Sequence, residues 1–168
     1  MRTFLLAAAL VAAVSSSAAA QETEVTVERI DDNPTFGVGV VAGTTTGATG
    51  KIYVIPTAAL QMTVGSYNFH DGISGQAEFV WEPAVLVDSP SVRLPFYFGA
   101  GTRLSHWQHG DSMQTDLALR VPAGVSCQPK LAPIDVFLEG AFDVNVLSEP
   151  TPLRRMALTA ALGLRYFF

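Results

Sequence analysis

The chain has 168 residues, of which 49% are hydrophobic and only 15% are charged, and its formal net charge is −5 at pH 7. An acidic chain without a Lys/Arg cluster does not match the phosphate backbone, which excludes nucleic acid as a partner. The single cysteine excludes an intrachain disulfide framework and a cysteine-rich zinc site. The aromatic and β-branched content also excludes a disordered chain.

The first 20 residues have the pattern of a secretory signal peptide. Arg2 is followed by an apolar run over 4–14 and by three alanines at 18–20. A charged start, an apolar stretch and an A-x-A site predict cleavage before Gln21 and export of the protein. An uncleaved membrane anchor is the less favoured alternative, because the apolar run is shorter than the ~20 residues of a spanning helix.

After the leader, the pattern predicts a short tail and a β-domain. Residues 21–34 are acidic and are interpreted as a short tail. From residue 35 onward no stretch has a helical period, and segments of alternating apolar and polar residues recur between turn signals. These predict eight strands: 35–43, 50–56, 58–67, 73–82, 91–104, 115–126, 134–145 and 155–168. We therefore predict one all-β domain over 35–168.

Charged residues in five of these segments keep to one face of the strand. Successive side chains of a strand point to opposite faces, and Asp135, Glu139 and Asp143 share one parity while their apolar neighbours share the other. The same alternation holds for Glu78, Glu82, Arg93, Arg103, Asp116, Arg120, Arg155 and Arg165. Each strand is therefore expected to have one polar and one apolar face.

Alternation alone is consistent with two kinds of barrel. One is a lipocalin-like soluble barrel with the apolar face around a ligand, and the other is a membrane barrel with that face toward lipid. The polar face is rich in glycine, which suits a narrow lumen, and the acids of 134–145 lie between Arg120, Arg155 and Arg165 on the neighbouring strands. Aromatic residues near strand ends are typical of membrane interfaces. They are Phe36, Trp81, Tyr166 and Phe168 at one rim and Trp107 at the other. These features favour an eight-stranded antiparallel up-and-down transmembrane β-barrel.

The C-terminal segment resembles the terminal signature of bacterial outer-membrane barrels. It ends on Phe168, with Leu162, Leu164 and Tyr166 at every second position before it. Further motifs of the resemblance lie at 36–40, 49–51, 119–124 and 135–139. Together, over 35–168, they resemble small outer-membrane β-barrel proteins of the OmpA/OmpX-like eight-stranded type. The resemblance implies periplasmic termini, recognition of the last segment by the barrel-assembly machinery, and no catalytic residue.

This orientation assigns each predicted connection to one side of the membrane. Extracellular connections are expected near 44–49, 68–72, 105–114 and 146–153. Periplasmic connections are expected at 56–57, 83–90 and 127–133. Cys127 then lies at a periplasmic turn, where we interpret it as a small structural residue rather than a catalytic thiol.

The sequence holds three weak signals for chemistry. The stretch from Gly43 to Lys51 fails the phosphate-loop pattern twice, at Thr45 and Ile52, and Lys51 is interpreted as a lumen-facing cation. His106, His109 and Asp111 offer too few ligands for a defined metal site.

The third signal is for an enzyme. Ser105, His106 and Ser112 raise the alternative of a lipid A deacylase-like enzyme, but the His-x-Ser arrangement of that family is absent, because Trp107 and Gln108 follow the histidine.

The paired carboxylates Glu78 and Glu82 could mimic an acid/base pair, but Arg93 on the next strand favours a structural network. An eight-stranded barrel is just wide enough to be filled by side chains, and an open porin is therefore not expected. Candidates for this plug are Arg93, Tyr97, Arg103, Arg120, Glu139 and Arg165. The predicted lumen charge network comprises Lys51, Glu78, Glu82, Arg93, Arg103, Arg120, Asp135, Glu139, Asp143, Arg155 and Arg165.

The sequence therefore predicts an outer-membrane protein with a structural or surface-interaction role. It predicts no catalysis, cofactor or metal. The expected partners are outer-membrane lipid and the barrel-assembly machinery, and the oligomeric state is left open.

Overall fold

A computed structural model describes residues 35–67, 72–109, 112–149 and 156–168. Its strands are β1 (Phe36–Gly43), β2 (Thr45–Ile55), β3 (Ala58–Tyr67), β4 (Gly72–Asp88), β5 (Val92–His109), β6 (Ser112–Pro129), β7 (Ile134–Glu149) and β8 (Met156–Phe167). The predicted signal peptide, the acidic tail and Arg155 lie outside the described residues. Within these ranges, no helix is long and apolar enough to cross a membrane.

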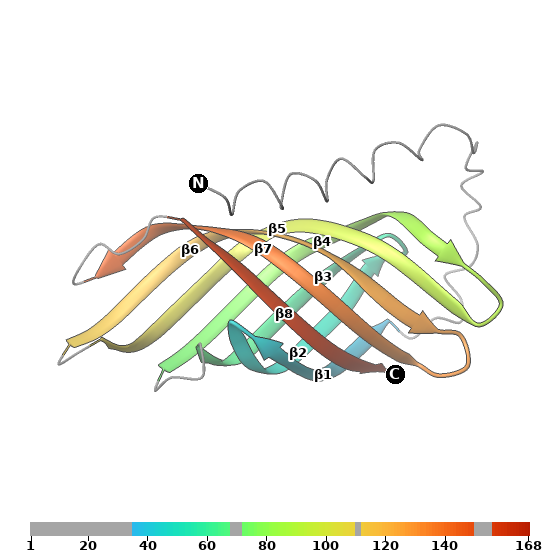
Figure 1. Ribbon diagram of the computed structural model, residues 1–168, viewed down its shortest axis with the longest axis horizontal. Coiled ribbons are helices and arrows are strands. Elements are labelled where there is room, and N and C mark those ends of the chain that lie inside the picture. Colours follow the sequence, from blue (N-terminus) through green and yellow to red (C-terminus); the bar gives the residue numbers. More distant parts are fainter. Residues whose placement is uncertain (1–34, 68–71, 110–111, 150–155) are drawn as a thin grey trace, which may run out of the picture. The chain divides into compact units, whose positions relative to one another are not determined.

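The strands form one closed barrel in which each is hydrogen-bonded to its neighbours in chain order (Figure 1). All pairs are antiparallel, and β1 closes on β8 from Gly37 opposite Phe167 to Gly43 opposite Ala161. The strands run obliquely around the barrel, as closure of a sheet requires. The predicted all-β, eight-stranded, up-and-down barrel is thereby confirmed.

Several predicted connections prove to be strand. β4 continues through Pro83 to Asp88 and β5 continues to His109, so that the connections predicted at 83–90 and 105–114 are wrong in extent. Likewise β6 covers Ser112–Pro129 and β7 ends at Glu149. Pro83 is tolerated because the register shifts between Trp81 and Ala84, and a bulge needs no ladder bond from proline.

The first connection is also shorter than predicted. β2 begins at Thr45, and the loop expected over 44–49 is reduced to Thr44. The hydroxyl of Thr46 donates to the carbonyl of Gly43 over 3.0 Å and accepts from its amide over 3.1 Å, which closes a tight turn. The strand signal is weak here because threonine and glycine give no apolar–polar alternation.

Inside the barrel, four aromatic side chains lie on glycines directly opposite them on a neighbouring strand. The pairs are Phe167 on Gly37, Trp107 on Gly72, Tyr97 on Gly124 and Phe137 on Gly163. A Cβ at Gly163 would lie 2.3 Å from Cζ of Phe137, and one at Gly124 would lie 2.6 Å from Cζ of Tyr97. The missing side chains of Gly37, Gly124 and Gly163 therefore make room for large rings in a narrow interior, and at Gly72 a Cβ would meet Cβ of Trp107.

One of these rings corrects a prediction. The sequence places Trp107 on a lipid-facing aromatic rim, but in the barrel it shares the interior face of β5 with Arg103 and Ser105. Its ring lies on that of Tyr67, with the ring centroids 4.8 Å apart. The alternation of β5 continues past the predicted strand end, and it therefore carries Trp107 inward.

Candidate functional site

The barrel is polar inside and apolar outside. Charged residues such as Lys51, Asp135 and Arg165 are at most 1% exposed. By contrast, Val40 and Met62 on the outer face are 65% and 64% exposed. This distribution is the reverse of that in a water-soluble protein, in which charged side chains are almost never fully buried unless they are paired.

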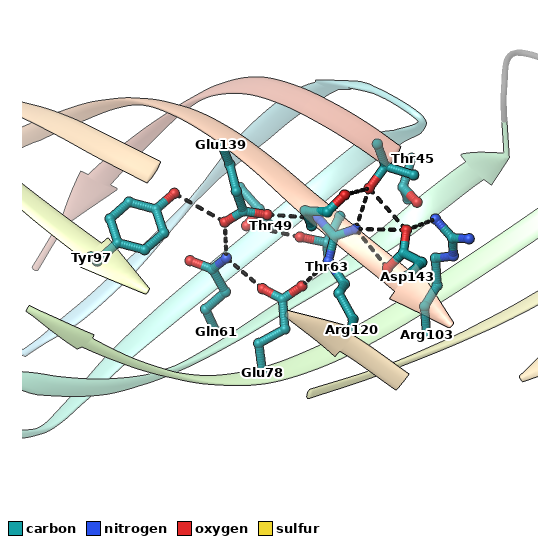
Figure 2. A network of polar contacts seen from close by, with 12 residues as sticks. Thr45, Thr49, Gln61, Thr63, Glu78, Tyr97, Arg103, Arg120, Glu139 and Asp143 are labelled. Atoms are coloured by element: carbon teal, nitrogen blue, oxygen red, sulfur yellow. Dashed lines mark hydrogen bonds and ion pairs between the residues drawn. The ribbon is translucent and has the colours of Figure 1, made fainter. Parts of the chain in front are cut away.

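The centre of the lumen is a cluster around Arg120 (Figure 2). Its guanidinium donates to Glu78, to Glu139 over 2.8 Å and to Asp143 over 3.2 Å. These carboxylates project from β4 and β7, so that one side chain of β6 links three strands. The planar fork of arginine suits this role because it offers five donors in fixed directions.

Further donors satisfy the three carboxylates. The amide of Gln61 donates to both Glu78 and Glu139 over 2.6 Å, and the hydroxyl of Tyr97 donates to Glu139 over 3.0 Å. Arg103 forms an ion pair of 2.8 Å with Asp143. Figure 2 shows these groups converging across the lumen, which side chains fill at this level.

A second cluster lies toward the end of the barrel at which β8 ends, here named the C-terminal end. The ammonium of Lys51 is 2.6 Å from Oε1 of Glu82, which also accepts from the hydroxyl of Tyr53 over 2.6 Å. Arg93 lies 3.9 Å from the other oxygen of Glu82, donates to Gln128 over 3.1 Å, and its side chain is 33% exposed.

Arg165 links this second cluster to the central one. Its guanidinium is 3.5 Å from Asp135 and 3.8 Å from the ring centroid of Phe137. It also donates to the hydroxyl of Thr49 over 3.1 Å and to the carbonyl oxygen of Gln61 over 2.9 Å. A cation in contact with an aromatic face and several acceptors is well stabilised in a buried site.

The opposite end of the lumen is held mainly by neutral groups. Asp116 accepts hydrogen bonds from Gln114 over 3.2 Å, Asn145 over 3.3 Å and Ser148 over 2.5 Å. A second chain of hydroxyls joins Ser105 to Ser74 and Ser74 to Thr45. Among the described residues, these hydroxyls and Asp116 are thus hydrogen-bonded by neutral partners.

The structure places ten residues of the predicted lumen network in the interior: Lys51, Glu78, Glu82, Arg93, Arg103, Arg120, Asp135, Glu139, Asp143 and Arg165. Of the paired carboxylates Glu78 and Glu82, Glu82 lies 3.9 Å from Arg93, whereas Glu78 pairs with Arg120 across the lumen.

Sequence reasoning missed the neutral members of the site. They are Thr49, Tyr53, Gln61, Thr63, Gln128 and Ser126. Thr49 and Tyr53 share the parity of Lys51, and Ser126 and Gln128 share that of Arg120, which was the available signal. Gln61 and Thr63 lie on β3, where no charged residue marks the interior face.

The enzyme alternative rested on Ser105 and His106, which point to opposite faces of β5. Ser105 is buried inside, whereas His106 points outward and its Nδ1 is 2.8 Å from the hydroxyl of Thr115. Adjacent residues of a strand face opposite ways, so this pair is not a catalytic dyad. Asp111 lies outside the described residues. In the part of the chain that the structure describes, no group of three or more His, Cys, Asp or Glu could hold a metal ion.

The residues of the predicted assembly signal lie on the outer face of β8. Leu162, Leu164, Tyr166 and Phe168 are 56%, 45%, 46% and 68% exposed. The rings of Tyr166 and Phe168 are in edge contact, with centroids 5.0 Å apart. Leu162 and Leu164 also line a shallow apolar depression along the seam with β1.

No protein-family model, curated protein or solved structure matches this chain.

Proposed function

We propose that this chain is an integral β-barrel protein of the bacterial outer membrane, with a structural or surface-interaction role and no catalytic machinery. The observation that carries the proposal is the apolar exterior. Large apolar side chains are exposed on every strand, for example Val40 on β1, Met62 on β3, Phe79 on β4 and Leu138 on β7.

Water is a poor solvent for such a surface. Burial of apolar surface is worth roughly 25 cal/mol per Å², and soluble monomers rarely expose apolar patches beyond a few hundred Å². Here the apolar residues encircle the barrel. Hydrocarbon accommodates them at no such cost, and a closed sheet satisfies its backbone groups without water.

The contents of the lumen fit the same environment. The buried ion pairs around Arg120 and Lys51 lie where no lipid reaches them, and the charges offset one another. A lipocalin-like barrel would instead line its interior with apolar groups for a ligand. The filled central layer also argues against an open pore.

The proposed orientation places the C-terminal end in the periplasm. Phe36, Trp81, Tyr166 and Phe168 are exposed toward this end, where they would form the periplasmic aromatic rim. The outer face of β8 then carries the segment that the barrel-assembly machinery would recognise.

Cell fractionation tests the proposal. We expect the protein in the outer-membrane fraction, resistant to urea extraction, with a gel mobility that changes on boiling because the closed barrel resists detergent. Recovery in the soluble periplasm would favour the lipocalin-like alternative. Lipid A mass spectra with and without the gene should be identical, and a changed acylation pattern would instead indicate a lipid-modifying enzyme.

A further inference from the structure

Among the described residues, three buried charged atoms have no hydrogen-bond partner: Oε2 of Glu82, Oδ2 of Asp135 and Nη1 of Arg165. All three residues are at most 4% exposed. Asp135 Oδ2 and Arg165 Nη1 face each other at 3.5 Å, too far apart for a good hydrogen bond. Burial of a charged atom without a hydrogen bond carries a large desolvation penalty. We therefore expect each of these three atoms to have a hydrogen-bond partner.

These atoms belong to one connected group of side chains. Tyr53 donates to Glu82, and Gln128 donates to the hydroxyls of Tyr53 over 3.4 Å and of Ser126 over 3.2 Å. Ser126 in turn donates to Asp135. Gln128 also holds Arg93, which is partly exposed at the C-terminal end, so the group reaches the barrel mouth.

In the central cluster around Arg120, by contrast, the charged groups have hydrogen-bond partners. Both carboxylate oxygens of Glu78, Glu139 and Asp143 accept hydrogen bonds, and all three nitrogens of the Arg120 guanidinium donate. None of these carboxylate oxygens and Arg120 nitrogens lacks a hydrogen-bond partner. The layer therefore forms a dry partition across the lumen.

We propose that water enters the barrel from the C-terminal end and occupies a blind chamber among Glu82, Asp135 and Arg165, with the Arg120 layer as its inner wall. Buried water typically makes two to four hydrogen bonds to otherwise unsatisfied polar groups, and these three atoms supply them. The chamber is a blind, hydrated half of the lumen. This inference depends on the barrel interior alone and does not depend on the membrane location.

A matched pair of serine variants tests this asymmetry. Ser126 belongs to the chamber and Ser105 to the hydroxyl chain beyond Arg120, and both are 1% exposed. Ser126→Cys and Ser105→Cys are each made in a Cys127→Ser background, which removes the only native thiol. The purified folded variants are exposed to silver ion, and the thiols that remain free are counted after unfolding.

We expect Ser126→Cys to react roughly tenfold or more faster than Ser105→Cys, because thiol reactivity follows access to solvent. Equally slow reaction of both would show a dry chamber and overturn the proposal. Equally fast reaction would show that the half of the lumen beyond Arg120 is as accessible to water as the chamber and would overturn the proposed asymmetry.

A high-resolution crystal structure of the unaltered chain gives a second measurement, should Ser126→Cys fail to fold. The proposal expects an ordered water bonded to both Asp135 Oδ2 and Arg165 Nη1. Direct hydrogen bonds between these atoms, with no water between them, would contradict it. Neither result depends on where the protein resides in the cell.

Discussion

At Gly163, one hydrogen atom occupies the place where any other residue would carry a Cβ against the ring of Phe137. The same ring supports the guanidinium of Arg165, so a displaced ring would also disturb a buried cation. The packing of an aromatic ring against a glycine thus also affects the position of a buried charged group in the lumen. The narrow barrel can hold both because the glycine lies directly opposite the ring.

Gly163→Ala is therefore expected to destabilise the barrel by about 1–3 kcal/mol, the usual cost of overpacking a tight interior. Urea-induced unfolding of the purified protein measures this change. Gly75→Ala is the matched control, because a Cβ at Gly75 meets no atom within 4 Å. Equal stability of the two variants would contradict the packing role of Gly163.

Arg120 is the residue on which the central cluster depends. Arg120→Met would leave Glu78, Glu139 and Asp143 buried with only partial compensation, and we expect a loss of about 3–5 kcal/mol in the free energy of unfolding. Urea-induced unfolding of the purified variant measures this loss.

The control for Arg120 is Lys130→Met at the exposed pair with Asp88. There the hydrogen bond from Lys130 lowers the pKa of Asp88, but solvent screens the pair, and no measurable loss of stability is expected. If Arg120→Met were as harmless as Lys130→Met, the central cluster would not stabilise the barrel.

At the scale of the strand, parity is what the sequence reveals best. Asp135, Glu139 and Asp143 predict the interior face of β7, and the structure places all three inside. Strand ends are less predictable. β4 passes through Pro83 because a bulge forms there, and β2 begins among threonines and glycines that carry little apolar signal.

The apolar parity leads to a prediction for the outer face. Met62 lies near the middle of β3 and is 64% exposed. In lipid bilayers, Met62→Arg should cost about 2–4 kcal/mol, because a charge on the lipid face is most unfavourable near the bilayer midplane. Unfolding of the protein in vesicles by urea provides the measurement.

Leu131→Arg is the control for Met62. Leu131 is 93% exposed and follows the end of β6, where an added charge would meet water or headgroups. We expect this variant to keep the stability of the unaltered chain. A harmless Met62→Arg would mean that the outer face of β3 does not contact hydrocarbon.

At the scale of the whole molecule, the sequence predicts which charges lie inside but not which of them pair. Arg120 on β6 bonds to Glu78 on β4, a strand that is not its neighbour, so its partner depends on how side chains cross the lumen. The bridging role of Gln61 between Glu78 and Glu139 depends on the same closure. Such contacts follow from register and barrel diameter, which strand patterns alone do not supply.

The chain has two tryptophans, and they lie on opposite faces of the barrel wall. Their fluorescence can therefore report the environment of each face. Trp81 is 47% exposed on the outer face, and Trp107 lies inside against Tyr67. Trp107→Phe leaves Trp81 as the single tryptophan, and Trp81→Phe leaves Trp107. Quenching of their fluorescence by lipids with brominated acyl chains then reports which face meets hydrocarbon.

In reconstituted vesicles, we expect strong quenching of Trp81 and little quenching of Trp107. Absence of quenching at Trp81, or equal quenching of the two tryptophans, would contradict a barrel whose apolar exterior faces lipid and whose polar interior is closed to it.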